Sequence, residues 1–175
     1  MVKCLLVIVV FIAISIAAAA AYVWSGYYNV AATVPHWNIT YDLFQTMRDR
    51  SIAHHSKGII SPQLGDPKLS HTGFVHFHTV CRLCHGAPGM NRTEFARGLY
   101  PGPPDLGSKV LQSQFADAEL FRIVRNGIKM TGMPSFADSV QGEDELWGIV
   151  AFLRKLPELD PDQYKAMVTQ SGLSE

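Results

Sequence analysis

The chain has 175 residues, of which 47% are hydrophobic and 17% charged, and its 15 basic and 15 acidic residues give a formal net charge of zero. This composition excludes a disordered protein, which is poor in large apolar residues and rich in charge. A neutral balance gives no support for nucleic-acid binding, which normally needs a basic excess. Three cysteines are too few for a fold built on disulfides.

Residues 4–23 form an apolar stretch, CLLVIVVFIAISIAAAAAYV, with serine as its one polar side chain. As a helix this stretch spans about 30 Å, the hydrocarbon thickness of a bilayer. Three aromatic residues of the kind found at membrane interfaces follow it: Trp24, Tyr27 and Tyr28. We therefore predict an uncleaved transmembrane anchor over residues 1–28. The alternative is a signal peptide that is cleaved after the run of alanines.

Lys3 precedes the apolar stretch, and basic residues favour the cytoplasmic side, so we expect the rest of the chain to lie outside the cytoplasm. Cys4 stands ahead of the apolar core, where a lipoprotein cleavage site would not be placed. We interpret Cys4 as a small apolar residue at the membrane edge.

Residues 29–68 are predicted as a juxtamembrane segment and linker. Within it, residues 41–55 carry apolar side chains at helical spacing, and Thr40 is a suitable N-cap. This pattern predicts a short amphipathic helix that lies on the membrane, on its own domain or on a partner. Glycines and prolines then mark an irregular linker.

A second domain is predicted over residues 69–160, followed by a C-terminal tail over residues 161–175. Helical periodicity predicts three helices: one with Ser70 as its N-cap that runs to about Cys84, one with Asp117 as its N-cap that ends near Gly127, and one from about Glu143 to Leu156. No stretch alternates as a strand does. We therefore predict an all-α domain with long loops.

The sequence C-R-L-C-H at residues 81–85 indicates the chemistry. Two cysteines three residues apart at a helix end present both sulfurs to one side, where each can add to a porphyrin vinyl group. The motif predicts one haem c attached through Cys81 and Cys84, with His85 as an axial ligand. A zinc site would need a second pair of ligands, and a redox pair of the thioredoxin type would need a βαβ setting. A plain disulfide would leave His85 without a role.

The sequence G-M-P-S-F at residues 132–136 supplies the predicted sixth ligand, Met133. A thioether is a soft ligand that favours ferrous iron, and the proline that follows biases Met133 away from helical geometry. Met130 is the nearest rival, and Met90 is weaker because it follows the attachment motif too closely.

Ligation by two histidines is the other alternative for the iron. The histidines considered for this role are His54, His55, His71, His76 and His78. His76 and His78 lie on the attachment helix itself, where their geometry is poor, so we predict that they face solvent.

With these motifs the chain resembles the mono-haem class I cytochromes c, and particularly their membrane-anchored bacterial members, over about residues 69–158. The resemblance rests on C-R-L-C-H, G-M-P, the register Gly73-x-x-x-Phe77-x-x-x-Cys81 and I-V-A-F-L-R at 149–154. It implies a class I cytochrome c fold behind the transmembrane helix. It also implies that the first and last helices of the domain pack at a crossing formed by Gly73, Phe77, Ile149 and Phe152.

In this family a proline carbonyl accepts a hydrogen bond from the proximal histidine, and the Pro-x-Leu pattern at 104–106 assigns this role to Pro104. Arg97 and Tyr100 are the candidate partners of the haem propionates.

The resemblance implies one-electron transfer, with redox proteins as partners and no small-molecule substrate, because both axial positions of the iron are filled. Together with the predicted anchor and Lys3, which come from outside the matching range, it predicts a single-pass protein of the bacterial inner membrane with its haem domain in the periplasm. A basic rim would orient an acidic partner; its members are Arg122, Arg125 and Lys129.

Two questions remain open at this point. The first is whether the electron carrier is a subunit of a respiratory or other electron-transport complex or a stand-alone tethered shuttle. The second is whether the protein is instead a haem enzyme or a gas or redox sensor, in which Met133 leaves the iron readily.

Overall fold

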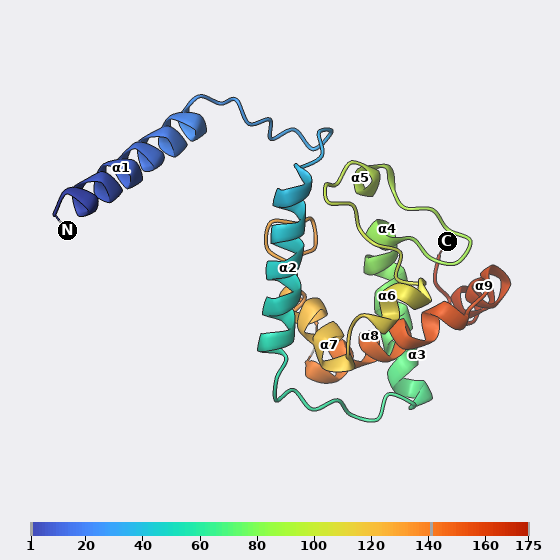
Figure 1. Ribbon diagram of the computed structural model, residues 1–175. Coiled ribbons are helices and arrows are strands. Elements are labelled where there is room, and N and C mark those ends of the chain that lie inside the picture. The colour runs from blue at the N-terminus through green and yellow to red at the C-terminus, as the bar shows by residue number, and fades with distance from the viewer. Residues whose placement is uncertain (1, 141, 175) are drawn as a thin grey trace. The chain divides into compact units, whose positions relative to one another are not determined.

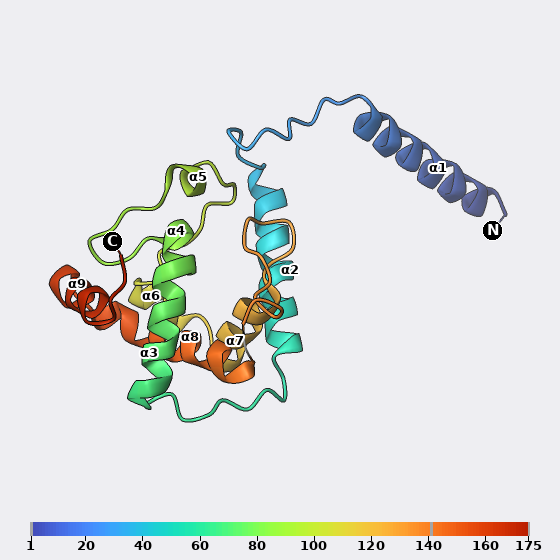
Figure 2. The same cartoon turned by 180° about the vertical axis from the view of Figure 1, so that it is seen from behind.

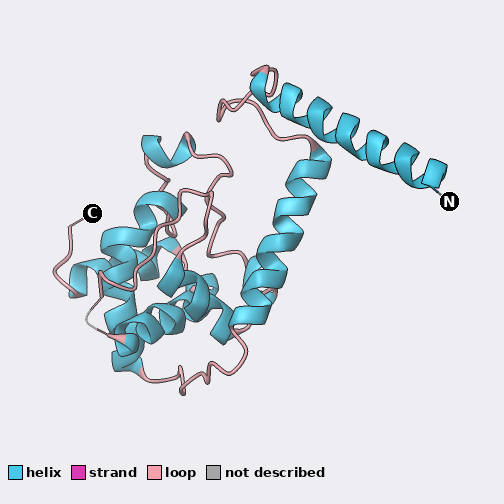
Figure 3. Cartoon of the chain, turned by 90° about the vertical axis from the view of Figure 1, so that its left-hand side faces the viewer, coloured by secondary structure: helices cyan, strands magenta, loops and turns pink. Residues whose placement is uncertain are grey.

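A computed structural model describes residues 2–140 and 142–174 of the chain. The chain divides into two compact units, Met1–Val34 and Pro35–Glu175, and each is described by itself. Among the described residues the regular structure is helical and contains no strand (Figures 1–3), which confirms the all-α prediction. Most of the predicted segment 29–68 belongs to the second unit.

The first unit is built on one helix, α1 (Val2–Trp24). Its side chains are exposed along its whole length, and an 18-residue window within it has a mean hydropathy of 3.0. The one polar side chain of the apolar stretch, Ser15, donates its hydroxyl proton to the carbonyl of Phe11 at 2.9 Å. By length and composition, α1 can cross a membrane.

The second unit begins with α2 (Asn38–His55), which packs against α7 (Asp117–Asn126) beside it. Trp37 occupies the N-cap position of α2, so the predicted N-cap Thr40 is wrong. No side-chain hydrogen bond caps this helix end, and Thr40 lies within the first turn. Ile52 is the buried residue of α2.

A continuous helical segment leads to the C-R-L-C-H motif. It comprises α3 (Pro67–His76), a π-helical turn η1 (Phe77–Cys81) and α4 (Arg82–His85). The prediction of Ser70 as the N-cap is wrong, because the side chain of Asp66 accepts the backbone N–H of Lys68 at 2.8 Å and caps the helix instead. Proline is favoured at the next position, the first of the helix.

Short helices and loops complete the unit. These are α5 (Glu94–Arg97), α6 (Lys109–Ser113), α7, α8 (Glu143–Lys155), the 3-10 turn η2 (Leu156–Glu158) and α9 (Pro161–Gln170). The positions of α7 and α8 agree with the predicted helices. Asp117, however, is the first residue of α7 and not its N-cap, which is Ala116. The carboxylate of Glu119 accepts the backbone N–H of Ala116 at 2.8 Å.

The core lies where α3 crosses α8, and two glycines make the crossing possible. A Cβ atom on Gly73 would overlap the carbonyl group of Gly148, and one on Gly148 would come within 2.8 Å of the Leu69 carbonyl oxygen. The fully buried rings of Phe77 and Phe152 pack beside the crossing with their centroids 5.1 Å apart. The predicted packing of these two helices is confirmed, with Gly148 as the residue that Gly73 meets.

Residues 161–175, expected only as a tail, contain α9, and this helix buries Tyr164 in the core. The Tyr164 hydroxyl lies 3.0 Å from Nδ1 of His78, and the carbonyl oxygen of Ser174 lies 2.9 Å from Nε2. Because a carbonyl only accepts, Nε2 donates to it and Nδ1 accepts from Tyr164. The prediction that His78 faces solvent is therefore wrong, since the C-terminal segment covers it.

His76, the other histidine predicted to face solvent, is half-buried instead, so that prediction is also wrong. Its Nδ1 lies 3.0 Å from Oε1 of Glu145 on α8, and its ring packs edge-on against Phe136. The crossing of α3 with α8 brings these groups together.

We expect a Tyr164→Phe variant to lower the free energy of unfolding by about 1–3 kcal/mol, because the buried Nδ1 of His78 loses its donor. Urea titration followed by circular dichroism measures this change. A Tyr41→Phe variant, which removes a hydroxyl from the exposed Tyr41 of α2, is the matched control and should stay within about 0.5 kcal/mol of the parent protein. Equal effects of the two variants would contradict the prediction.

Candidate functional site

The end of the helical segment formed by α3, η1 and α4 carries both motif cysteines and the motif histidine. Cys81 is the last residue of the π-helical turn, and Cys84 and His85 close α4. The helix stops there because Gly86 has a left-handed φ of 76°. The three side chains therefore come from little more than one turn of chain.

The two thiols are free and half-buried. Burial, aided by the neighbouring Cys84, raises the pKa of the Cys81 thiol to about 12. Within residues 2–140 and 142–174, no group of three or more His, Cys, Asp or Glu side chains could hold a metal ion. The alternative of a zinc site therefore has no set of ligands in this part of the chain.

His85 is held in one orientation by a backbone carbonyl. Its Nδ1 lies 2.8 Å from the carbonyl oxygen of Pro104, which is the hydrogen bond that the resemblance implied. Because the carbonyl only accepts, Nδ1 carries the proton and Nε2 keeps a free lone pair. Burial lowers the pKa of His85, the hydrogen bond to Pro104 opposes this, and the charge of Arg92 lowers it further. The neutral ring can therefore act as a metal ligand through Nε2.

Met133 is half-buried in a loop that folds back onto the end of α7. Its carbonyl accepts the backbone N–H of Ile128 at 3.2 Å, and its own N–H donates to the Thr131 hydroxyl at 3.1 Å. Gly127 has a left-handed φ of 65°, and a Cβ atom there would lie 2.7 Å from the Met133 carbonyl oxygen. These contacts determine where the backbone of Met133 runs.

The rival methionines have different surroundings. Met130 is 74% exposed and has a left-handed φ of 63°. Met90 is partly buried against the hydrophobic core, and its backbone pairs with that of Ala87. The exposure of Met130 favours Met133 over its nearest rival.

The candidate propionate partners lie in different settings. Arg97 is exposed, whereas the Tyr100 hydroxyl accepts the backbone N–H of His36 at 2.9 Å, and the two rings lie 5.2 Å apart. The contribution of His36 was missed, because it lies in a segment to which no motif assigns a role. Gly132 faces Leu99, whose side chain a Cβ atom on Gly132 would approach within 2.8 Å.

Among the described residues, only part of the predicted basic rim presents an exposed positive charge without an acidic partner at hand. Arg125 and Lys129 are exposed and Arg122 is half-buried. An ion pair with Glu143, at 3.6 Å, offsets the charge of Arg125.

The donor set fits a covalently bound haem. Two free thiols and an imidazole with one ring nitrogen held by a carbonyl lie together at a helix end, and Met133 supplies a thioether from a separate, constrained loop. Soft sulfur and imidazole donors are those that haem iron accepts as axial ligands.

Residues 69–153 match the family model described as cytochrome C oxidase, cbb3-type, subunit III. The matched range starts within α3, ends within α8 and contains the C-R-L-C-H motif and Met133. The helices α1, α2 and α9 lie outside it. A search of curated proteins found no match to the chain.

Proposed function

Because residues 69–153 form a domain of the class I cytochrome c family, we propose that the chain is a membrane-tethered electron carrier on the periplasmic side of a bacterial inner membrane. The cytochrome c domain itself makes an electron-transfer role the natural one for this fold. The tether, the side of the membrane and the partners are the proposed parts.

The observation that carries the proposal is the geometry at the helix end. Nδ1 of His85 is fixed by the Pro104 carbonyl, and the unpaired thiols of Cys81 and Cys84 stand on the same short segment. A ring fixed in this way presents Nε2 without having to reorient, which lowers the entropic cost of coordination.

Four residues would hold one haem c: Cys81 and Cys84 would form thioethers to it, and His85 and Met133 would bind its iron. When bound, haem c supplies a one-electron couple. With His85 and Met133 both bound to the iron, no position would remain for a substrate, and the residues present would support electron exchange with partner proteins.

The membrane part of the proposal rests on α1. This helix is 23 residues long and exposes apolar side chains along its length, and Lys3 precedes its apolar stretch. A retained α1 would hold the domain at a bilayer surface. The family model takes its description from a subunit of an oxidase, so we propose that this chain too is a subunit of a membrane-bound electron-transport complex.

We expect gentle detergent extraction of membranes, followed by native electrophoresis and haem staining, to show this chain in a band well above its own mass of 19.3 kDa. A high-salt wash without detergent should leave the protein in the membrane fraction, because an apolar helix is not released by salt. Haem stain confined to the monomer position would refute the complex. Release by salt alone would refute the tether.

A further inference from the structure

The carbonyl that holds His85 lies in a long irregular loop. No helix spans the residues between α5, which ends at Arg97, and α6, which begins at Lys109. A backbone carbonyl in such a loop keeps one position only where other contacts hold the chain. The hydrogen bond to His85 therefore depends on what immobilises Pro104.

Three successive carbonyls of this loop each accept a hydrogen bond from a different place. The Pro104 carbonyl accepts from His85, and that of Asp105 accepts the Ser108 backbone N–H at 3.3 Å. The Leu106 carbonyl accepts the side-chain amide of Gln112 at 2.8 Å. Besides His85 itself, the side chain that ties these carbonyls to a helix is that of Gln112, on α6.

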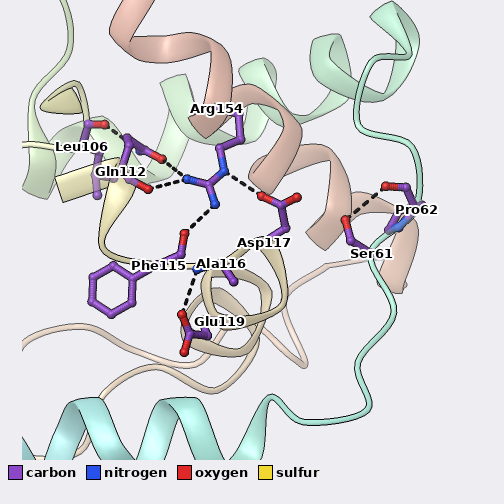
Figure 4. A network of polar contacts seen from close by, with 9 residues as sticks. All are labelled: Ser61, Pro62, Leu106, Gln112, Phe115, Ala116, Asp117, Glu119 and Arg154. Carbon is purple, nitrogen blue, oxygen red and sulfur yellow. Dashed lines mark hydrogen bonds and ion pairs between the residues drawn. The ribbon is translucent and has the colours of Figure 1, made fainter. Parts of the chain in front are cut away.

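Gln112 is the buried polar residue of α6, with only 8% of its surface exposed. Its amide nitrogen is directed to Leu106, whereas its amide oxygen and its backbone carbonyl both face Arg154, as Figure 4 shows. Nη1 of Arg154 donates to the backbone oxygen at 2.6 Å and to the amide oxygen at 3.1 Å. Because the amide oxygen of Gln112 accepts from Arg154, the amide nitrogen on the other side of the group must point toward Leu106.

Arg154 lies near the C-terminal end of α8 and ties this helix to the start of α7. Its Nη2 donates to the Phe115 carbonyl at 2.6 Å, and its Nε pairs with the carboxylate of Asp117 at 2.7 Å. A planar guanidinium holds several acceptors in fixed relative positions. A chain of contacts thus runs from α8 through Arg154, Gln112 and the Pro104 loop to His85.

We propose that Gln112 and Arg154 are positioning residues that hold the Pro104 carbonyl on Nδ1 of His85 and so set the strength of His85 as an iron ligand. This inference rests on the proposed binding of haem by His85. A carbonyl that accepts the Nδ1 proton makes the opposite nitrogen more basic. A more basic ligand favours ferric iron, so a loosened Pro104 carbonyl shifts the iron toward the ferrous state.

Gln112→Leu tests the proposal in the haem-loaded, full-length protein. It keeps the net charge and removes the donor to Leu106. The control is Gln114→Leu, the same change at an exposed position two residues along the chain. We measure the hydrogen-exchange rate of the His85 Nδ1 proton by NMR of the reduced protein. We also measure the ratio of reduced to oxidised haem at the midpoint potential of the parent protein.

We expect Gln112→Leu to speed the exchange of the Nδ1 proton at least tenfold. We also expect it to raise the ratio of reduced to oxidised haem about threefold, where a tenfold change in this ratio corresponds to 59 mV for one electron. Gln114→Leu should change neither. Arg154→Lys, which keeps the charge but not the planar fork, should shift both quantities in the same direction as Gln112→Leu. Gln112→Glu keeps the side-chain volume and the acceptor for Arg154 but removes the donor to Leu106. If the leucine variant does not fold, this variant is the test, and it should shift both quantities in the same direction.

A purely structural role for Gln112 would lower the free energy of unfolding and leave the exchange rate and the haem ratio within twofold of the parent values, and this outcome would overturn the inference. Failure of the proposed function gives a different result, because the parent protein itself would then carry no covalent haem.

Discussion

A protein in which Cys81 and Cys84 are both replaced by alanine is expected to carry no covalent haem and to lose its fixed tertiary structure. Long parts of the second unit are loops, among them the stretch between α5 and α6 and the loop that carries Met133. Such loops bury little apolar surface among themselves, so in our proposal the haem supplies a large part of the surface on which they pack. Without the haem, the packing of the loops no longer offsets the conformational entropy that they lose on folding.

Haem staining after denaturing electrophoresis and near-ultraviolet circular dichroism measure these two losses. Either single variant, Cys81→Ala or Cys84→Ala, keeps one thioether and should retain a reduced amount of bound haem. Cys4→Ala is the matched control, since Cys4 lies on α1 and is exposed; it should stain as the parent protein does. Full haem staining of the double variant would refute the proposed attachment.

A Met133→Ala variant is expected to keep its covalent haem and to have a midpoint potential lower by about 0.1–0.3 V, within the ~0.8 V over which axial ligands set haem potentials. A thioether stabilises ferrous iron, so its loss favours the ferric state. The open axial position should also bind carbon monoxide, which the parent protein should not. Redox titration and absorption spectra of the reduced protein with carbon monoxide give both results.

Met130→Ala removes the same side chain from an exposed position and should leave the potential and the carbon monoxide response unchanged. A lower potential and carbon monoxide binding in Met130→Ala, with neither change in Met133→Ala, would make Met130 the iron ligand. Binding of carbon monoxide by the parent protein would favour the competing function, a haem enzyme or sensor in which Met133 leaves the iron readily.

The features predicted correctly from the sequence are those that short patterns determine. The resemblance implied the crossing of α3 and α8 at Gly73, and the contact between Gly73 and Gly148 confirms it. The hydrogen bond from His85 to Pro104 was implied by the resemblance and is present. The assignment of Met133 to the iron stays a prediction, because a half-buried position is compatible with ligation and does not demonstrate it.

The features that were missed depend on residues far apart in the chain. His78 was expected in solvent because nothing in its neighbourhood indicates that α9 returns to cover it through Tyr164, 86 residues away. Arg154 suits the helix dipole at the end of α8, and this local role gave no hint of its contacts with α6 and α7. The N-caps at Ser70 and Asp117 were misplaced because several polar residues near each helix start satisfy the same rule.

The burial of His78 has a consequence for the order in which the protein matures. Synthesis runs from the N-terminus to the C-terminus, and His78 lies three residues before Cys81, whereas Tyr164 and Ser174, which cover it, belong to the last part of the chain. The two thiols are therefore made well before the segment that closes over their helix. Attachment during that interval would meet a chain in which His78 is still uncovered, whereas attachment after it would meet a helix already held by Tyr164 and Ser174.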